Sequence, residues 1–162
     1  DFGPVLHPAR KYTLLIEQSV QSQNGQPLEA EYQKEFRTVP DDRSRPLPQK
    51  WKLSLPQVGS RTPLRIEFGE PLDHALVQRC IEVRTLQGQQ VSCCVTLQNH
   101  ESVALLTPTD PWPSAEHKLT VAPILEDLAG NTPVRIFDTD LTKKDGVRPK
   151  LQLPFHLQHR SN

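Results

Sequence analysis

The chain has 162 residues with 19 basic and 19 acidic side chains, so its formal net charge is zero. This balance offers no basic surface for nucleic acid or an anionic membrane. No apolar run approaches the roughly 18 residues of a membrane span, and the first ten residues lack the features of a signal peptide. Sixteen prolines disfavour long helices, and the absence of methionine, even at position 1, leads us to expect a processed product or an excised piece of a longer protein.

Short segments in which apolar and polar side chains alternate recur along the chain, and this pattern is typical of β-strands. In chain order the expected strands are Lys11–Val20, Trp51–Val58, Pro63–Pro71, Cys80–Leu86, Gln89–Gln98, Ser102–Pro108 and His117–Ile124. Proline, glycine, asparagine or aspartate bounds most of them. The sequence therefore predicts an all-β protein, built as an antiparallel sandwich or barrel.

The connections between these strands carry recognisable signals. One helical turn is expected at Leu72–Arg79, because Asp73 can cap its first N–H groups and the apolar side chains fall on one side. Gly88 marks a hairpin turn between two strands. Residues 41–50 combine prolines and charges without an apolar period, and we expect a linker there.

Two segments of the chain have similar sequence patterns. A shift of 105 residues lays Pro8–Tyr32 over Pro113–Phe137, so that Gly25 meets Gly130 and the strand-turn-strand patterns coincide. This period is about the size of one immunoglobulin-type sandwich. Residues 1–40 are therefore expected to be the last strands of an incomplete repeat whose first strands lie upstream.

The segment Leu125–Pro133 places two carboxylates beside a Gly-Asn pair and predicts a tight turn. Gly130 can adopt positive φ, Asn131 tolerates unusual backbone angles, and Asp127 can accept hydrogen bonds from the N–H groups that follow it. Replacement of Asp127 by alanine should then cost about 1 kcal/mol.

The same segment has a second interpretation as a calcium site with Glu126, Asp127 and Asn131 as ligands. The spacing does not fit the calcium-loop template, which needs oxygen ligands at alternate positions. The earlier copy also has Gln21 and Ser22 in place of the two carboxylates. A structural turn is therefore the favoured interpretation, and no cofactor is expected.

The stretch "PLRIEFGEPLD", followed by "LLTPTDPWPSAEHKLTVAPILEDLAGN", resembles the bacterial immunoglobulin-like repeats of surface-layer and other exported proteins. Those repeats carry the signatures F-S-E-P-M-D, F-T-P and D-x-A-G-N in this order. The matching residues are Phe68, Glu70, Pro71, Asp73, Thr107, Pro108, Asp127, Ala129, Gly130 and Asn131. Gly69, Leu72 and His117 depart from the family pattern, the last by replacing a tyrosine.

This resemblance implies a sandwich over residues 51–141, with residues 142–162 as an extension that could add one strand. It also implies a periplasmic, cell-surface or secreted location and a non-catalytic role in spacing, display or protein binding. An accessory carbohydrate-binding domain of an exported enzyme is the alternative, and a calcium-stabilised adhesion repeat is a weaker third.

The partner is expected to be a protein or a second copy of the chain, since the half-repeat would expose strand edges. Two strands alone bury little surface. They could pack on the complete domain, pair with Lys150–Gln158, or pair between molecules, which is the favoured route.

Catalytic motifs are absent from the sequence, and a few polar residues allow weaker hypotheses. Glu70 and Asp73 could form an acid–base pair, although a capping role for Asp73 is preferred. Trp51 and Trp112 could stack on a sugar, although we expect Trp112 to close the end of the sandwich. His156 and His159 lie in the C-terminal tail, where disorder is preferred over a metal site.

The chain has three cysteines, which leaves at least one thiol without a disulfide partner. Cys93 and Cys94 are neighbours on one expected strand, so their side chains should point to opposite faces. One of them could reach Cys80 across the Gly88 turn. Burial of the thiols is nevertheless favoured over a disulfide.

Overall fold

The computed structural model describes residues 5–137 and 149–158. The chain divides into two compact units, Asp1–Asp42 and Arg43–Asn162. Each unit is described by itself.

The first unit is a β-hairpin. Strands β1 (Lys11–Ile16) and β2 (Tyr32–Arg37) pair antiparallel from Lys11 opposite Arg37 to Ile16 opposite Tyr32. The strand expected to continue to Val20 ends at Ile16, because the Val20 N–H donates to the Glu17 carbonyl at 3.1 Å and turns the chain. None of residues 5–42 is buried, so the hairpin has no core of its own.

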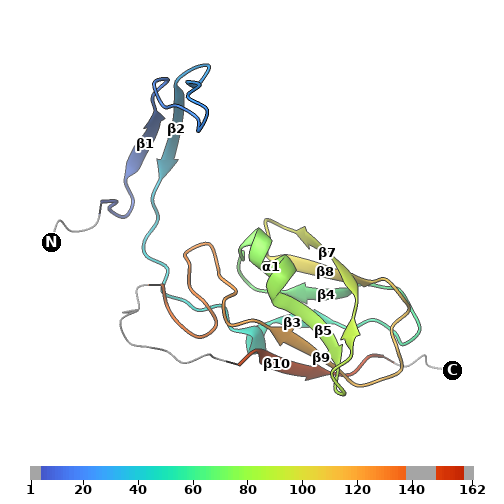
Figure 1. Ribbon diagram of the computed structural model, residues 1–162. Helices are drawn as coiled ribbons and strands as arrows, with labels where there is room; N and C mark the ends of the chain where they lie inside the picture. Colours follow the sequence, from blue (N-terminus) through green and yellow to red (C-terminus); the bar gives the residue numbers. More distant parts are fainter. Residues whose placement is uncertain (1–4, 138–148, 159–162) are drawn as a thin grey trace. The chain divides into compact units, whose positions relative to one another are not determined.

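The second unit is an all-β fold with two four-stranded antiparallel sheets (Figure 1). Their strands are β3 (Lys52–Ser54), β4 (Leu64–Glu67), β5 (Ile81–Thr85), β6 (Gln90–Val91), β7 (Cys93–Gln98), β8 (Val103–Pro108), β9 (His117–Val121) and β10 (Leu151–Phe155). One sheet has the order β10-β9-β5-β6 and the other β3-β4-β8-β7. The predicted antiparallel all-β class is therefore confirmed.

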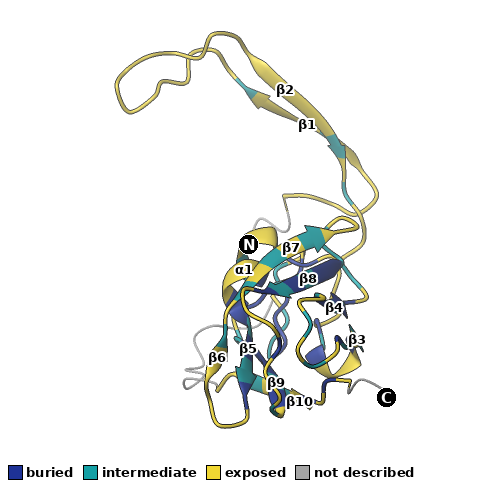
Figure 2. Cartoon of the chain, turned by 90° about the vertical axis from the view of Figure 1, so that its right-hand side faces the viewer, coloured by how far each residue is buried: buried dark blue, intermediate teal, exposed yellow. Residues whose placement is uncertain are grey.

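The core lies between the two sheets, as the buried residues in Figure 2 indicate. Leu64 and Ile66 on β4 are fully buried, and so are Leu119 and Val121 on β9 in the other sheet. All four belong to one hydrophobic cluster. Alternation along each strand produces this arrangement, because every second side chain points to the same face.

The predicted helical turn is present. Helix α1 (His74–Cys80) begins after Asp73, whose carboxylate accepts a hydrogen bond from the Leu76 N–H at 2.8 Å. Leu72 and Val77 are buried in the core, as the apolar pattern predicted. The capping role expected for Asp73 is therefore confirmed.

The single strand expected over Gln89–Gln98 is wrong. This segment forms β6 in one sheet and β7 in the other, and the chain changes sheets at Ser92. The Ser92 carbonyl there accepts from the Thr109 N–H at 2.9 Å, which joins this corner to the end of β8. Alternation alone does not reveal such a crossing, because the pattern of buried residues continues through it.

The C-terminal residues contribute to the second unit. Strand β10 pairs with β9 from Leu151 opposite Val121 to Phe155 opposite His117. The chain then continues beside residues 56–58, where the Gln158 N–H donates to the Pro56 carbonyl at 3.1 Å. Pairing of this segment with the N-terminal hairpin is therefore not the arrangement found, because β9 is its partner.

The expected linker also contributes packing. Pro46 and Pro48 are buried, and the short 3₁₀ helix η1 (Pro48–Lys50) precedes β3. Residues 41–45 and 49–50 are exposed, and the buried prolines lie between them. Proline rings provide apolar surface without a backbone donor, so a proline-rich segment can cover a core without forming a strand.

Candidate functional site

The segment predicted to be a turn is a buried network centred on Asp127. One carboxylate oxygen of Asp127 accepts from the N–H groups of Ala129 at 2.8 Å and Asn131 at 2.9 Å. The other oxygen accepts from the side-chain amide of Asn131 at 2.9 Å. Gly130 has φ of 81°, as its position in the turn requires. These hydrogen bonds to the Asp127 carboxylate all come from the turn itself, and the Glu70 carboxylate lies within 4.8 Å of it.

The amide of Asn131 extends this network to the following segment. Its side-chain oxygen accepts from the Phe137 N–H at 3.0 Å. Asn131 is fully buried and Asp127 is 4% exposed, so water does not compete freely for these groups. Hydrogen bonds in such surroundings stabilise the native conformation mainly because their loss leaves buried donors unsatisfied.

This turn is joined to the corner that contains Asp73. The Asp73 N–H donates to the Glu126 carbonyl at 2.9 Å, and Leu72 and Asp127 form an isolated antiparallel bridge. Two segments that are far apart in the sequence are therefore held together by backbone hydrogen bonds.

The same turn recurs 105 residues earlier in the hairpin. The Gly25 N–H donates to the Ser22 carbonyl at 2.9 Å, as the Gly130 N–H donates to the Asp127 carbonyl at 3.2 Å. The Ser22 N–H donates to the Gln26 carbonyl at 2.8 Å, matching the 3.0 Å bond from Asp127 to Asn131. These are equivalent positions under the 105-residue shift.

The two turns also have equivalent hydrogen bonds to a side chain. The Ser22 hydroxyl accepts from the Gln26 N–H at 3.2 Å, where the Asp127 carboxylate accepts from the Asn131 N–H. Gly25 has φ of 77°. The turn therefore forms with a hydroxyl in place of a carboxylate.

The calcium hypothesis depends on Glu126, Asp127 and Asn131 offering oxygen atoms to an ion. In the structure both carboxylate oxygens of Asp127 accept hydrogen bonds, and the side-chain oxygen of Asn131 accepts the Phe137 N–H. One of these oxygens, Asp127 Oδ2, accepts only the bond from the Asn131 amide among the described residues, and the Glu70 carboxylate lies within 4.8 Å of the Asp127 carboxylate, so an ion there would not have to displace the bonds of the turn. Chemically, the arrangement is suited to fixing backbone conformation.

The other carboxylate and histidine hypotheses find little support in the described residues. Asp73 is engaged in capping α1, and Glu70 is half-buried at the same corner. His156 is exposed and lies 3.8 Å from the Glu116 carboxylate. His159 lies outside the described residues.

Trp51 and Trp112 do not form a platform for sugar stacking, because their side chains are 7% and 1% exposed. The Trp112 indole N–H donates to the Thr62 carbonyl at 2.8 Å, and Trp51 packs edge-on against Phe68 with ring centroids 4.7 Å apart. Both rings are parts of the core. The expectation that Trp112 closes the sandwich agrees with this burial.

His117 is a buried titratable group whose environment the sequence did not identify. Its ring stacks on Phe155 with centroids 5.5 Å apart and meets the edge of Trp112 at 5.9 Å. Neither ring nitrogen makes a hydrogen bond of ordinary geometry within the described residues. Burial lowers the pKa of His117, and the backbone of Ala115 acts in the opposite direction. The sequence feature that could have indicated this burial was the position of His117 on an alternating strand, where the family that the chain resembles has tyrosine.

Glu82 is a second charged group that sequence patterns missed. Its carboxylate lies 3.1 Å from the Arg84 guanidinium and 3.3 Å from the Lys150 ammonium, which precedes β10. Burial raises the pKa of Glu82, but hydrogen bonds from Arg84 and Lys150 outweigh burial and lower it overall. This cluster connects β5 with the C-terminal segment.

The three cysteines, all within the described residues, form no disulfide. Cys80 is buried at the end of α1, whereas Cys93 and Cys94 lie on β7 in the sheet that does not contain β5. The predicted route across the Gly88 turn is therefore wrong. Burial raises the pKa of the Cys93 thiol to about 11, with a further contribution from Cys94.

The chain matches no protein-family model, no curated protein and no solved structure. Among the described residues, no helix combines the length and the apolar character needed to cross a membrane.

Proposed function

We propose that this chain is a non-catalytic, immunoglobulin-like structural and interaction module of a larger exported bacterial protein, with a spacing, display or protein-binding role. The proposal is carried by the buried hydrogen-bond network of the Asp127 turn and its connection to the Asp73 corner. Asp73, Asp127 and Asn131 are polar residues of the family signatures, and in this chain their side chains bond to the backbone and to one another. Signature residues that are used in this way favour a structural role.

The fold agrees with this role. Two antiparallel sheets enclose one core, and the signature residues Phe68 and Pro108 are buried in the second unit. Immunoglobulin-like modules share such a sandwich and present strand edges and loops to partners. The location in an exported protein follows only from the family resemblance.

The equivalent turns at Ser22–Gln26 and Asp127–Asn131 support a tandem arrangement. Three backbone or side-chain hydrogen bonds coincide under the 105-residue shift. We propose that residues 1–40 are the last strands of a preceding repeat.

The alternative of carbohydrate binding loses its aromatic platform with the burial of both tryptophans. Calcium stabilisation would place an ion beside the Asp127 turn, where the Glu70 carboxylate lies within 4.8 Å of the Asp127 carboxylate. Both alternatives can be tested in one set of measurements on the full chain.

Thermal unfolding should be recorded in EDTA and in millimolar calcium chloride, and soluble glycans should be screened by calorimetry. A structural module should show the same melting temperature in both buffers and no saturable glycan binding. A calcium-dependent rise that Asp127→Ser abolishes, or saturable binding of a sugar, would contradict the proposal.

A further inference from the structure

His117 places an imidazole in the core of the second unit, and neither ring nitrogen makes a hydrogen bond of ordinary geometry to any residue that the structure describes. The side chain is fully buried, and its ring stacks on Phe155 and meets the edge of Trp112. Such a site suits a neutral ring, because a buried charge without a partner is far more costly than a buried neutral group. The packing around His117 therefore opposes its protonation.

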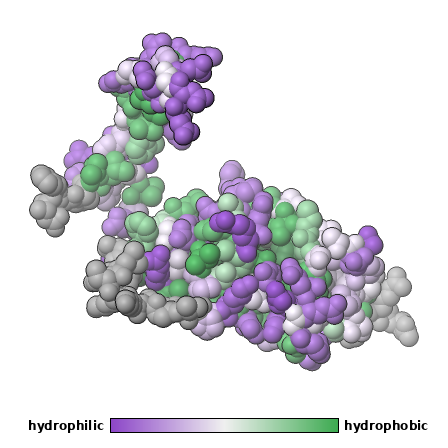
Figure 3. Space-filling view, in the orientation of Figure 1, coloured by the Kyte–Doolittle hydropathy of each residue, from purple (hydrophilic) through white to green (hydrophobic). Residues whose placement is uncertain are grey.

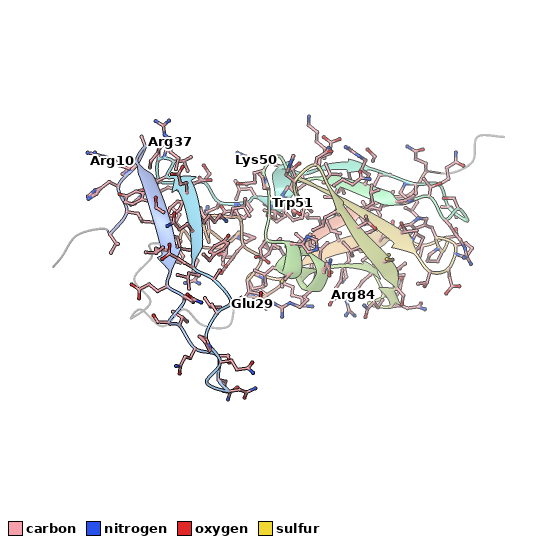
Figure 4. The ribbon with its side chains drawn as sticks, turned by 90° about the horizontal axis from the view of Figure 1, so that it is seen from above. Arg10, Glu29, Arg37, Lys50, Trp51 and Arg84 are labelled. Atoms are coloured by element: carbon pink, nitrogen blue, oxygen red, sulfur yellow. The ribbon has the colours of Figure 1, made fainter. Side chains whose placement is uncertain are left out.

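The charged residues of the neighbouring strands lie on the outer face of the sheet. His117 is opposite Phe155 on β10 and Thr85 on β5. Side chains alternate along a strand, so Lys118 and Arg84, which follow His117 and precede Thr85, point away from the core. Figure 4 shows Arg84 at the outside of the second unit, and Figure 3 shows mostly hydrophilic surface over its lower part, where β5, β9 and β10 lie. The outward-facing charged residues of this region are Glu82, Arg84, Lys118 and Lys150.

Three exposed titratable groups belong to the segments that surround His117, and they are Glu116, His156 and Asp110. The His156 ring lies 3.8 Å from the Glu116 carboxylate, so its protonation would favour attachment of β10. An exposed ion pair of this kind contributes little to stability. None of the three groups influences the pKa of His117, which burial lowers and the backbone of Ala115 raises.

Strand β10 is the element over His117 that can leave with the least disruption. It lies at the edge of its sheet and pairs only with β9. Its buried side chains are Phe155 and, just beyond the strand, Leu157. The chain is fastened after this point by backbone bonds, one of which runs from the Val58 N–H to the Gln158 carbonyl at 2.9 Å. Departure of residues 151–158 would thus leave the pairing of all the other strands intact, as local unfolding of an edge element requires.

We propose that protonation of His117 releases residues 151–158 from the second unit, which makes β10 an acid-sensitive strand. Removal of Phe155 from the imidazole face lets water reach the ring, and water can solvate the imidazolium that the closed core cannot. Release also frees the backbone groups of β9 that now pair with β10, so acid opens a sheet edge. This conformational change is a property of the second unit and does not depend on the role proposed for the module.

The direction of the pH dependence follows from the two states of the ring. In the released state His117 has the ordinary pKa of about 6.5, whereas burial lowers its pKa in the closed state. The opening equilibrium constant should therefore be independent of pH above about 6.5 and rise by up to about tenfold per pH unit below it, until the closed-state pKa is reached. Between about pH 7.5 and about pH 5.0 the rise amounts to at most about thirtyfold.

Hydrogen exchange of the full chain, followed by mass spectrometry at these two pH values and corrected for intrinsic exchange rates, tests the release. The opening constant of residues 151–158 should rise at least about fivefold at the lower pH, whereas that of β4 and β8 in the other sheet should stay the same. Unchanged protection of residues 151–158 would overturn the proposal. An equal rise in β4 and β8 would also overturn it, because the whole unit would then be unfolding.

Two histidine variants identify the group that takes up the proton. His117→Phe keeps an aromatic ring to stack on Phe155 but cannot titrate, so it should abolish the pH dependence at residues 151–158. His156→Ala is the matched control, since it removes the exposed histidine at the same end of β10 and should retain the dependence. A pH dependence that persists in His117→Phe, or disappears in His156→Ala, would refute the role of His117.

The wild-type chain gives a second readout that does not require either variant to fold. The ring resonances of His117, observed by NMR, should titrate with a midpoint below about pH 6.5, and residues 151–158 should lose protection over the same pH range. Titration of the ring while these residues keep their protection would show that the core accepts the charge without releasing β10, and the proposal would then be wrong.

Discussion

Replacement of Asp127 by alanine should destabilise the second unit by more than a single lost hydrogen bond. The carboxylate accepts from three N–H groups, and two of these belong to Asn131, which is fully buried. A buried donor left without an acceptor costs about 1–3 kcal/mol, so the two together should cost about 2–6 kcal/mol. The third donor, on the exposed Ala129, can bond to water at little cost.

Two further variants separate the carboxylate from the turn. Asp127→Ser should be less destabilising than Asp127→Ala, because a hydroxyl can accept from the Asn131 N–H as Ser22 accepts from the Gln26 N–H at 3.2 Å. It would still leave the Asn131 side-chain amide without that acceptor. Ser22→Ala is the matched control, since it removes the equivalent bond from the exposed turn and should leave unfolding of the second unit unchanged.

Urea unfolding followed by tryptophan fluorescence is the appropriate assay. The two tryptophans of the chain, Trp51 and Trp112, are both buried in the second unit, so the signal does not report on the hairpin. The midpoint should fall in the order wild type, Asp127→Ser, Asp127→Ala at an unchanged slope. A loss below about 1 kcal/mol for Asp127→Ala would refute the reasoning, because it would mean that the buried donors of Asn131 find other acceptors.

Two other predictions concern titratable groups. Because burial lowers the pKa of His117, the contribution of neutral His117 to the free energy of unfolding should be fully present above about pH 6.5. This contribution should decline as the pH falls toward the folded-state pKa. In His117→Leu the melting temperature should change less between about pH 7 and about pH 5 than it does in wild type, whereas the exposed His156→Ala should show the same pH dependence as wild type. The same pH dependence in all three proteins would contradict this. A maleimide reagent should modify the exposed Cys94 first and Cys93, with its raised pKa, much more slowly, as mass spectrometry of tryptic peptides would show. Faster labelling of the buried Cys80 than of Cys94 would be inconsistent with the structure.

Most of the strands of the second unit follow from sequence alternation, because this pattern directly reflects burial on one face of a sheet. The pattern failed at Ser92, where β6 and β7 belong to different sheets. Burial continues through the crossing, so the sequence contains no break that marks it. The same crossing rules out the less favoured disulfide route to Cys80, since its possible partners lie in the other sheet, whereas the favoured burial of Cys80 as a free thiol is confirmed.

The features of the candidate site that depend on residues close together in the sequence could be predicted. Gly130, Asp127 and the cap at Asp73 follow from residue preferences within a few positions of each other. The full burial of Asn131 and the hydrogen bonds joining this turn to the Asp73 corner depend on contacts between distant segments. The estimate of about 1 kcal/mol for Asp127→Ala counted local bonds without the burial of their donors, and the burial seen in the structure raises the predicted cost.

The difference between the two equivalent turns gives a physical reason for the carboxylate. Ser22 and Gln26 are exposed, so water can satisfy groups that the serine hydroxyl does not reach. Asp127 and Asn131 are buried, and there a hydroxyl would leave the Asn131 side-chain amide without its acceptor. A carboxylate has two oxygen atoms and accepts from all three donors at once. Burial of the turn thus favours aspartate at position 127, whereas the exposed turn can use serine at position 22.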